Sequence, residues 1–153
     1  MMSNVRKTAI GAVLVAAGLA AAPAAQAATA SQAVSAGCPG AYFCFYFNSN
    51  YGGAHADYLR SDGDLGNELF NKVGTSSNGL NVQVKNNAAS AYNNWSYLAT
   101  VYYNSGCNGS VASQSFGPYS SGNFNSTMKN NNASFRWPTS FGEYFDCANR
   151  DQF

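Results

Sequence analysis

Charged residues are scarce in this chain of 153 residues, because Lys, Arg, Asp and Glu together make up 10% of it. Eight basic residues stand against seven acidic ones, so the composition excludes a basic nucleic-acid binder and a charge-rich disordered tail. The chain also lacks a second histidine and any C-x-x-C pair. These absences argue against a zinc site and against catalysis built on a histidine or a free cysteine.

Long apolar runs are absent after residue 22. The run at residues 8–22 follows Arg6 and Lys7 and is shorter than the roughly 20 residues that span a bilayer. A small-residue triplet, Ala25-Gln26-Ala27, comes next. The pattern predicts a signal peptide at residues 1–27 and an extracellular product without a membrane anchor. We expect residues 28–37 to be a flexible mature N-terminus and residues 38–153 to form one domain.

The four cysteines all lie in the part of the chain that is expected to be exported. An oxidising compartment favours disulfides, and four cysteines allow three pairings. Cys38 and Cys44 are close in sequence and bracket the start of an expected strand, which leaves Cys107 and Cys147 for the second half. We therefore predict the disulfides Cys38–Cys44 and Cys107–Cys147.

Short apolar or alternating segments, separated by clusters of Asn, Gly and Ser, predict an all-β domain. A helical turn at residues 64–72 is as well supported as a loop. The expected strands cover residues 42–47, 54–59, 80–84, 89–93, 98–103, 110–116 and 133–137.

An internal repeat organises these segments. Residues 47–53 (FNSNYGG) align with residues 103–109 (YNSGCNG) at an offset of 56. Residues 84–90 (VKNNAAS) align with residues 128–134 (MKNNNAS) at an offset of 44. Two copies in the same order predict two Greek-key halves in one sandwich.

These motifs resemble those of the βγ-crystallin-like proteins, whose Greek-key hairpin has an aromatic residue six positions before a glycine and a later serine that closes over it. The resemblance implies an all-β, βγ-crystallin-like Greek-key sandwich of two motifs, stapled by disulfides, with repeat one at about 38–95 and repeat two at about 96–147. The matching residues are Phe47, Gly53 and Ser90 in the first repeat and Tyr103, Gly109 and Ser134 in the second. Glycine supplies the positive φ of the folded hairpin at low cost.

Residues 38–44 (CPGAYFC) and the turn at residues 50–53 (NYGG) resemble, more narrowly, exported proteins of peptidase inhibitor family 36, which is named for a streptomycete inhibitor of metalloproteinases. The resemblance implies a secreted, non-enzymatic proteinase inhibitor that docks a rigid loop in the target's cleft. The inhibitor that gives the family its name has a cysteine-bracketed loop with no close match here. The candidate loops are residues 48–53, residues 61–79 and the turn that Cys107 braces, formed by Asn104, Ser105, Gly106, Cys107 and Asn108.

Calcium is the one cofactor that the resemblance suggests, since related domains bind it through Asn/Asp-rich segments that end in hydroxyl residues. Calcium prefers six to eight oxygen ligands. Neither segment here contains a carboxylate, so weak binding or structural turns are the alternatives. The candidate ligands are Asn86, Asn87, Ser90, Asn130, Asn131 and Ser134.

A second function stays open, because the Asn and aromatic content also suits a cell-wall or carbohydrate-binding, antimicrobial protein. The aromatic candidates for stacking on sugars are Trp95, Tyr97, Tyr119, Phe124, Trp137, Phe141 and Tyr144. The expected partners are thus a secreted proteinase or a polysaccharide, with no nucleic acid and no membrane, and the protein is expected to be a monomer.

Overall fold

The computed structural model describes residues 37–138 and Cys147. The predicted signal peptide, most of the expected N-terminal segment and most of the tail after residue 138 lie outside the described residues. No described helix is long and apolar enough to cross a membrane. The strands are β1 (Phe43–Tyr46), β2 (His55–Tyr58), β3 (Ser90–Asn93), β4 (Ala99–Asn104), β5 (Asn108–Phe116), β6 (Ser121–Asn123) and β7 (Ser134–Arg136), and η3 (Ser49–Tyr51) and η4 (Leu65–Asn67) are short 3-10 turns.

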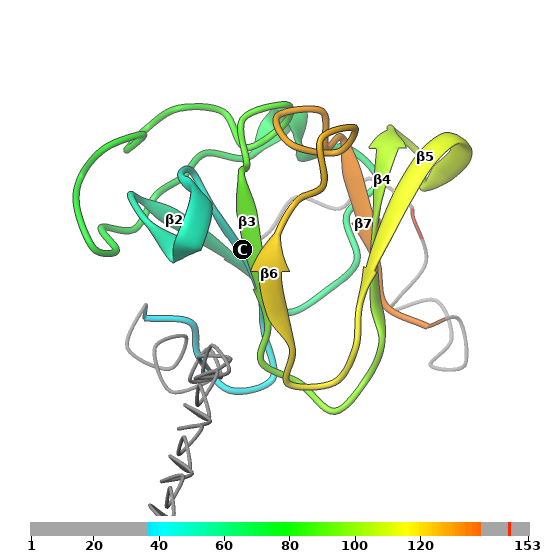
Figure 1. Ribbon diagram of the computed structural model, residues 1–153, viewed down its shortest axis with the longest axis horizontal. Helices are drawn as coiled ribbons and strands as arrows, with labels where there is room; N and C mark the ends of the chain where they lie inside the picture. Colours follow the sequence, from blue (N-terminus) through cyan, green and yellow to red (C-terminus); the bar gives the residue numbers. More distant parts are fainter. Residues whose placement is uncertain (1–36, 139–146, 148–153) are drawn as a thin grey trace, which may run out of the picture.

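Two antiparallel sheets face each other (Figure 1). One has the strand order β2-β1-β3-β6 and the other has the order β5-β4-β7. Each sheet takes a piece of the other half of the chain: β6 pairs with β3, and Asp62 forms a single bridge to Phe135 in β7. This exchange between halves is the Greek-key arrangement that the repeat predicts, and the all-β prediction is confirmed.

Aromatic side chains from both sheets fill the core. Phe43 and Phe45 point from β1 to Phe135 of β7, with ring centroids 5.2 and 5.8 Å apart. Trp137 packs edge-on against Phe135 and is 1% exposed. Edge-to-face and offset pairs of this kind are favourable beyond the area they bury.

The other face of β1 is also covered, which explains why its sequence is continuously apolar instead of alternating. Cys44 and Tyr46 form a second cluster with Cys38 and Tyr92. The disulfide Cys38–Cys44 lies in this cluster, and Cys107–Cys147 is the second disulfide. Both pairings agree with the prediction from cysteine spacing.

One predicted strand is wrong, and one observed strand has no counterpart among the predictions. Residues 80–84 form an irregular segment and not a strand. Their alternating apolar residues still have a packing role, since Val84 lies in the core. The Asn81 amide donates to the carbonyl of Phe70. Strand β6 was not predicted, because Ser121, Gly122 and Asn123 contain no large apolar side chain. The residues 64–72, where a helical turn and a loop were alternatives, contain η4 and otherwise irregular chain.

Candidate functional site

A buried serine closes the hairpin of the first repeat. The Ser90 hydroxyl donates to the carbonyl of Asn48 at 2.7 Å and accepts from the amide of Tyr51 at 3.0 Å. Gly53 adopts φ +80° and has no room for a side chain, because an added Cβ would lie 2.7 Å from the carbonyl oxygen of Asn78. The hairpin residues predicted from the sequence therefore meet in space.

An equivalent lock closes the second hairpin. The Ser134 hydroxyl donates to the carbonyl of Asn104 at 2.6 Å and accepts from the amide of Cys107 at 3.0 Å. Asn104 and Cys107 are the equivalents of Asn48 and Tyr51 at the offset of 56, and Ser134 is the equivalent of Ser90 at the offset of 44. The two locks thus have the same geometry in both halves.

The role predicted for Gly109 is wrong. Gly109 lies in β5 without a positive φ, and an added Cβ would meet Tyr102 only at an ordinary distance of 3.7 Å. Gly106 and Cys107 take the left-handed conformation, with φ of 70° and 53°, as Asn50 and Tyr51 do at the equivalent places of the first hairpin, with φ of 57° and 61°. The second hairpin therefore has the same left-handed pair as the first and lacks the further positive φ that Gly53 provides.

The two Asn-rich segments lie against each other across the repeats. The Asn86 amide donates to the carbonyl of Asn132 at 2.8 Å, and the Asn130 amide donates to the carbonyl of Ala88 at 3.0 Å. Asn86 and Asn130 both have positive φ, at 62° and 58°. Asparagine tolerates this conformation better than most residues, which gives these asparagines a structural role in turns.

Two equivalent surface grooves flank this contact. The first groove is lined by Phe47, Asn48, Ser49, Asn87, Lys129 and Asn130. The second groove is lined by Tyr103, Asn104, Ser105, Asn131, Lys85 and Asn86. Each groove combines the hairpin of one repeat with the lysine of the other, and the six candidate calcium residues lie in or beside the two grooves.

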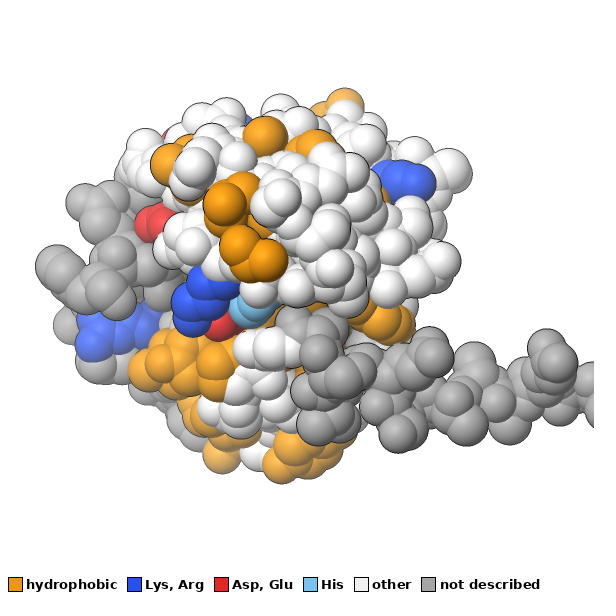
Figure 2. Space-filling view, turned by 90° about the vertical axis from the view of Figure 1, so that its left-hand side faces the viewer, with side chains coloured by type: hydrophobic (Ala, Val, Ile, Leu, Met, Phe, Trp, Pro, Cys, Tyr) orange, Lys and Arg blue, Asp and Glu red, His pale blue; other side chains and the backbone are white. Residues whose placement is uncertain are grey.

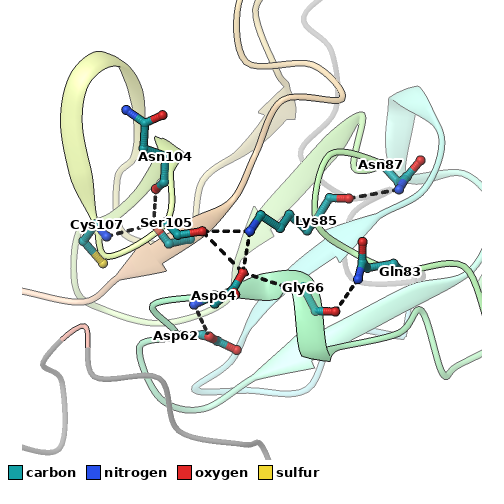
Figure 3. A network of polar contacts seen from close by, with 10 residues as sticks. Asp62, Asp64, Gly66, Gln83, Lys85, Asn87, Asn104, Ser105 and Cys107 are labelled. Carbon is teal, nitrogen blue, oxygen red and sulfur yellow. Dashed lines mark hydrogen bonds and ion pairs between the residues drawn. The ribbon is translucent and has the colours of Figure 1, made fainter.

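A polar network covers the second groove (Figure 3). The Lys85 ammonium donates to the Asp64 carboxylate at 2.7 Å and to the Ser105 hydroxyl at 2.8 Å. The hydrogen bond from Lys85 holds the pKa of Asp64 below its usual value, against a smaller opposing effect of burial. The Gly106 amide also donates to the carbonyl of Gly63 at 2.7 Å.

This network bears on the predicted contact loop at Asn104, Ser105, Gly106, Cys107 and Asn108. The structure makes it a tight turn whose backbone groups are bound within the domain and whose Cys107 is held by the disulfide to Cys147. Because these groups are already bound within the domain, the turn has few backbone groups left to offer a proteinase cleft.

A different segment protrudes from the fold. Residues 71–78, within the candidate stretch 61–79, arch beyond β2 (Figure 1), and every one of them except Gly74 is exposed. Val73, near the start of this loop, is 61% exposed. In the sequence, only the Gly, Thr, Ser and Asn content of the stretch indicates that residues 71–78 form an exposed loop.

Backbone contacts hold both ends of the 71–78 loop. Lys72 and His55 exchange amide-to-carbonyl hydrogen bonds of 3.1 and 2.9 Å. At the other end, the Gly53 amide donates to the Thr75 hydroxyl at 3.0 Å, and the Ala54 amide donates to the carbonyl of Asn78 at 2.8 Å. The loop is therefore anchored before and after its exposed middle.

A buried charge network reinforces the first end. The Asp57 carboxylate, 1% exposed, contacts the His55 ring at 2.7 Å and the Lys72 ammonium at 2.5 Å. Figure 2 shows basic, acidic and histidine side chains together on this face, next to exposed hydrophobic ones. The carboxylate is buried whereas the Lys72 side chain is 49% exposed, so the ion pair links the start of the loop to a buried group of β2. The only histidine of the chain is thus placed beside the loop.

The candidate sugar-stacking aromatics are mostly packed inside. Phe124 and Trp137 are buried, and Trp95 packs edge-on against Tyr97 and Trp137. Among those that the structure describes, Tyr119 is the exposed one. Phe141 and Tyr144 lie outside the described residues.

Comparison with known proteins agrees with these features. A solved structure reported as "Evolution of the eye lens beta-gamma-crystallin domain fold" superposes with a TM-score of 0.51 and 13% sequence identity, over 65% of this chain and 87% of that one. At this identity the likeness shows the fold: the protein has a βγ-crystallin-like domain. The search of curated proteins found no match.

Residues 31–114, more than half of the chain, match peptidase inhibitor family I36. The chain belongs to this family. Membership supports a proteinase-inhibitor function and makes the protein an inhibitor, not an enzyme. The two disulfides and the family are consistent with an extracellular protein.

Proposed function

We propose that the protein is secreted and inhibits metalloproteinases by inserting the 71–78 loop into the target's cleft. The observation that carries this proposal is an exposed loop, with Val73 near its start, whose two ends are fixed by hydrogen bonds to residues 53–55. The predicted signal peptide and the resemblance to streptomycete metalloproteinase inhibitors support the compartment and the class of target.

Rigidity is what makes this loop suitable. A segment that is already held in its bound shape loses little conformational entropy when it docks. Gly74 allows the loop backbone to run directly over the hairpin, because an added Cβ would lie 2.4 Å from the carbonyl oxygen of Gly53. The Asp57–Lys72 ion pair holds the residue that precedes Val73.

The chemistry of the exposed middle favours a cleft with an apolar pocket. Val73 offers an aliphatic side chain, and the residues after it offer small polar ones, Thr75, Ser76 and Ser77. Burying one aliphatic side chain of this size in a pocket contributes about 1.5 kcal/mol. In such a complex, the catalytic zinc of a metalloproteinase belongs to the target and not to this chain.

The test is a tight-binding titration of the purified, oxidised protein against a thermolysin-like metalloproteinase, with a subtilisin-like serine proteinase in parallel. We expect stoichiometric inhibition of the metalloproteinase and full activity of the serine proteinase. Inhibition of the serine proteinase alone would replace the proposed target class and leave the inhibitor function intact. Full activity of both enzymes at micromolar protein would contradict the proposal.

A further inference from the structure

Two lysines join the repeats at equivalent places. The Lys129 ammonium, from the second repeat, donates to the Ser49 hydroxyl of the first hairpin at 2.9 Å. The Lys85 ammonium, from the first repeat, donates to the Ser105 hydroxyl of the second hairpin at 2.8 Å. The serines are related by the offset of 56 and the lysines by the offset of 44. One contact is thus repeated under the internal symmetry of the domain.

An asparagine side chain also lines each groove. The Asn87 amide group lines the first groove and the Asn131 amide group lines the second, and each uses its NH₂ group to donate to a backbone carbonyl of its own segment, at 2.9 and 3.0 Å. This leaves the amide oxygens as the acceptors of these side chains. Each groove thus holds one lysine ammonium bound to a hairpin hydroxyl, with an asparagine side chain in its lining.

We propose that both grooves are cation sites which the chain fills with its own lysines, so that the native protein takes no calcium there. The ammonium groups of Lys85 and Lys129 stand where a divalent ion would need the same hydroxyl oxygens. A calcium ion in either groove would face a like charge at close range and would lose oxygen ligands to it.

The remaining candidate ligands do not compensate for this. The hydroxyls of Ser90 and Ser134 are buried, and each already donates to one hairpin carbonyl and accepts from one hairpin amide. Hence the two strongest hydroxyl candidates of the Asn-rich segments are committed to closing the hairpins. A calcium ion would have to break these locks to use them.

The two grooves differ in whether the lysine has a carboxylate partner. Asp64 contacts both Lys85 and Ser105, at 2.7 and 3.3 Å (Figure 3), whereas Lys129 makes no ion pair within the described part of the chain. Removing Lys85 therefore leaves the Asp64 carboxylate and the Ser105 hydroxyl without their cation. Removing Lys129 leaves neutral oxygens, which bind calcium more weakly.

The experiment is a calorimetric titration of calcium chloride into the unmodified protein and into the variants Lys85→Ala, Lys129→Ala and Lys72→Ala. Lys72→Ala is the matched control, because it removes the same charge from a lysine outside both grooves. Lys85→Met is a second variant that keeps the aliphatic stem and removes the charge. Near-UV circular dichroism verifies that each variant is folded, and thermal unfolding with calcium or with chelator gives an independent readout.

We expect no binding heat and no calcium-dependent change in Tm for the unmodified protein and for Lys72→Ala. Lys85→Ala and Lys85→Met should each gain one site with Kd of about 10⁻⁴–10⁻³ M, the range of extracellular calcium modules. Lys129→Ala should bind at least about tenfold more weakly, because its groove lacks the Asp64 carboxylate. Calcium binding by the unmodified protein would overturn the proposal, and so would folded Lys85 variants that remain insensitive to calcium.

Discussion

Removing the two serine locks is the most informative perturbation of the fold. In Ser90→Ala, the amide of Tyr51 and the carbonyl of Asn48 each lose their partner, and in Ser134→Ala the same happens to Cys107 and Asn104. A hydrogen bond contributes about 1 kcal/mol, and a buried group left without one costs about 1–3 kcal/mol. Each substitution should therefore lower the free energy of unfolding by about 2 kcal/mol.

The assays are chemical unfolding and thermal unfolding of the oxidised protein, both followed by tryptophan fluorescence. A loss of about 2 kcal/mol corresponds to a decrease in Tm of about 8 °C for a domain of this size. Ser115→Ala is the matched control, because its hydroxyl contacts Thr100 on the exposed surface of β5 and should change stability by less than about 0.5 kcal/mol. The reasoning fails if either lock variant is as stable as the control, and the equivalence of the locks fails if only one of them is destabilised.

Two further predictions concern glycines and tyrosines. Gly79→Ala should destabilise the protein by about 3 kcal/mol or more, because Gly79 has φ +85° and an added Cβ would lie 2.1 Å from the Phe47 ring. The control variant Gly109→Ala should have a free energy of unfolding within about 1 kcal/mol of that of the native protein. Equal midpoints of the two variants in urea unfolding would contradict this prediction. Burial raises the pKa of Tyr46 and of Tyr58 well above 10, so both keep their proton in the folded protein at a pH where the unfolded chain loses it. The sign follows directly: above about pH 10 the folded state binds more protons, and stability should fall by about 1.4 kcal/mol per pH unit for each of the two tyrosines. Absorbance titration at 295 nm should show two phenols that ionise only on unfolding, and a titration complete before unfolding would refute it.

Local pattern in the sequence was sufficient for part of the fold. The aromatic run of β1, the paired Ser90 and Ser134 motifs and the spacing of the cysteines all express local or repeated constraints, and the structure contains the elements and pairings they predict. Residues that fill the same place in two copies keep the same chemistry, so an internal repeat carries information on contacts between segments far apart in sequence.

Contacts specific to one copy were not predictable. The alternation at residues 80–84 resembles a strand, but Gly79 packs on Phe47 and turns the chain there. Strand β6 is formed by its pairing with β3, so Ser121 and Gly122 need no apolar pattern of their own. In the same way, the partners of Asp57 come from residues 2 and 15 positions away, and only the folded chain shows that they anchor a loop.

The central claim, that residues 71–78 form the inhibitory contact, is tested most directly by one pair of variants. Val73 and Val111 are each 61% exposed, one in the loop and the other in β5, and both can be changed to Asp at the surface. Inhibition constants for the metalloproteinase would be measured for Val73→Asp, Val111→Asp and the unmodified protein. We predict that Val73→Asp weakens inhibition by at least about 30-fold, equivalent to about 2 kcal/mol, and that Val111→Asp leaves it unchanged. Equal inhibition by all three proteins would contradict the account.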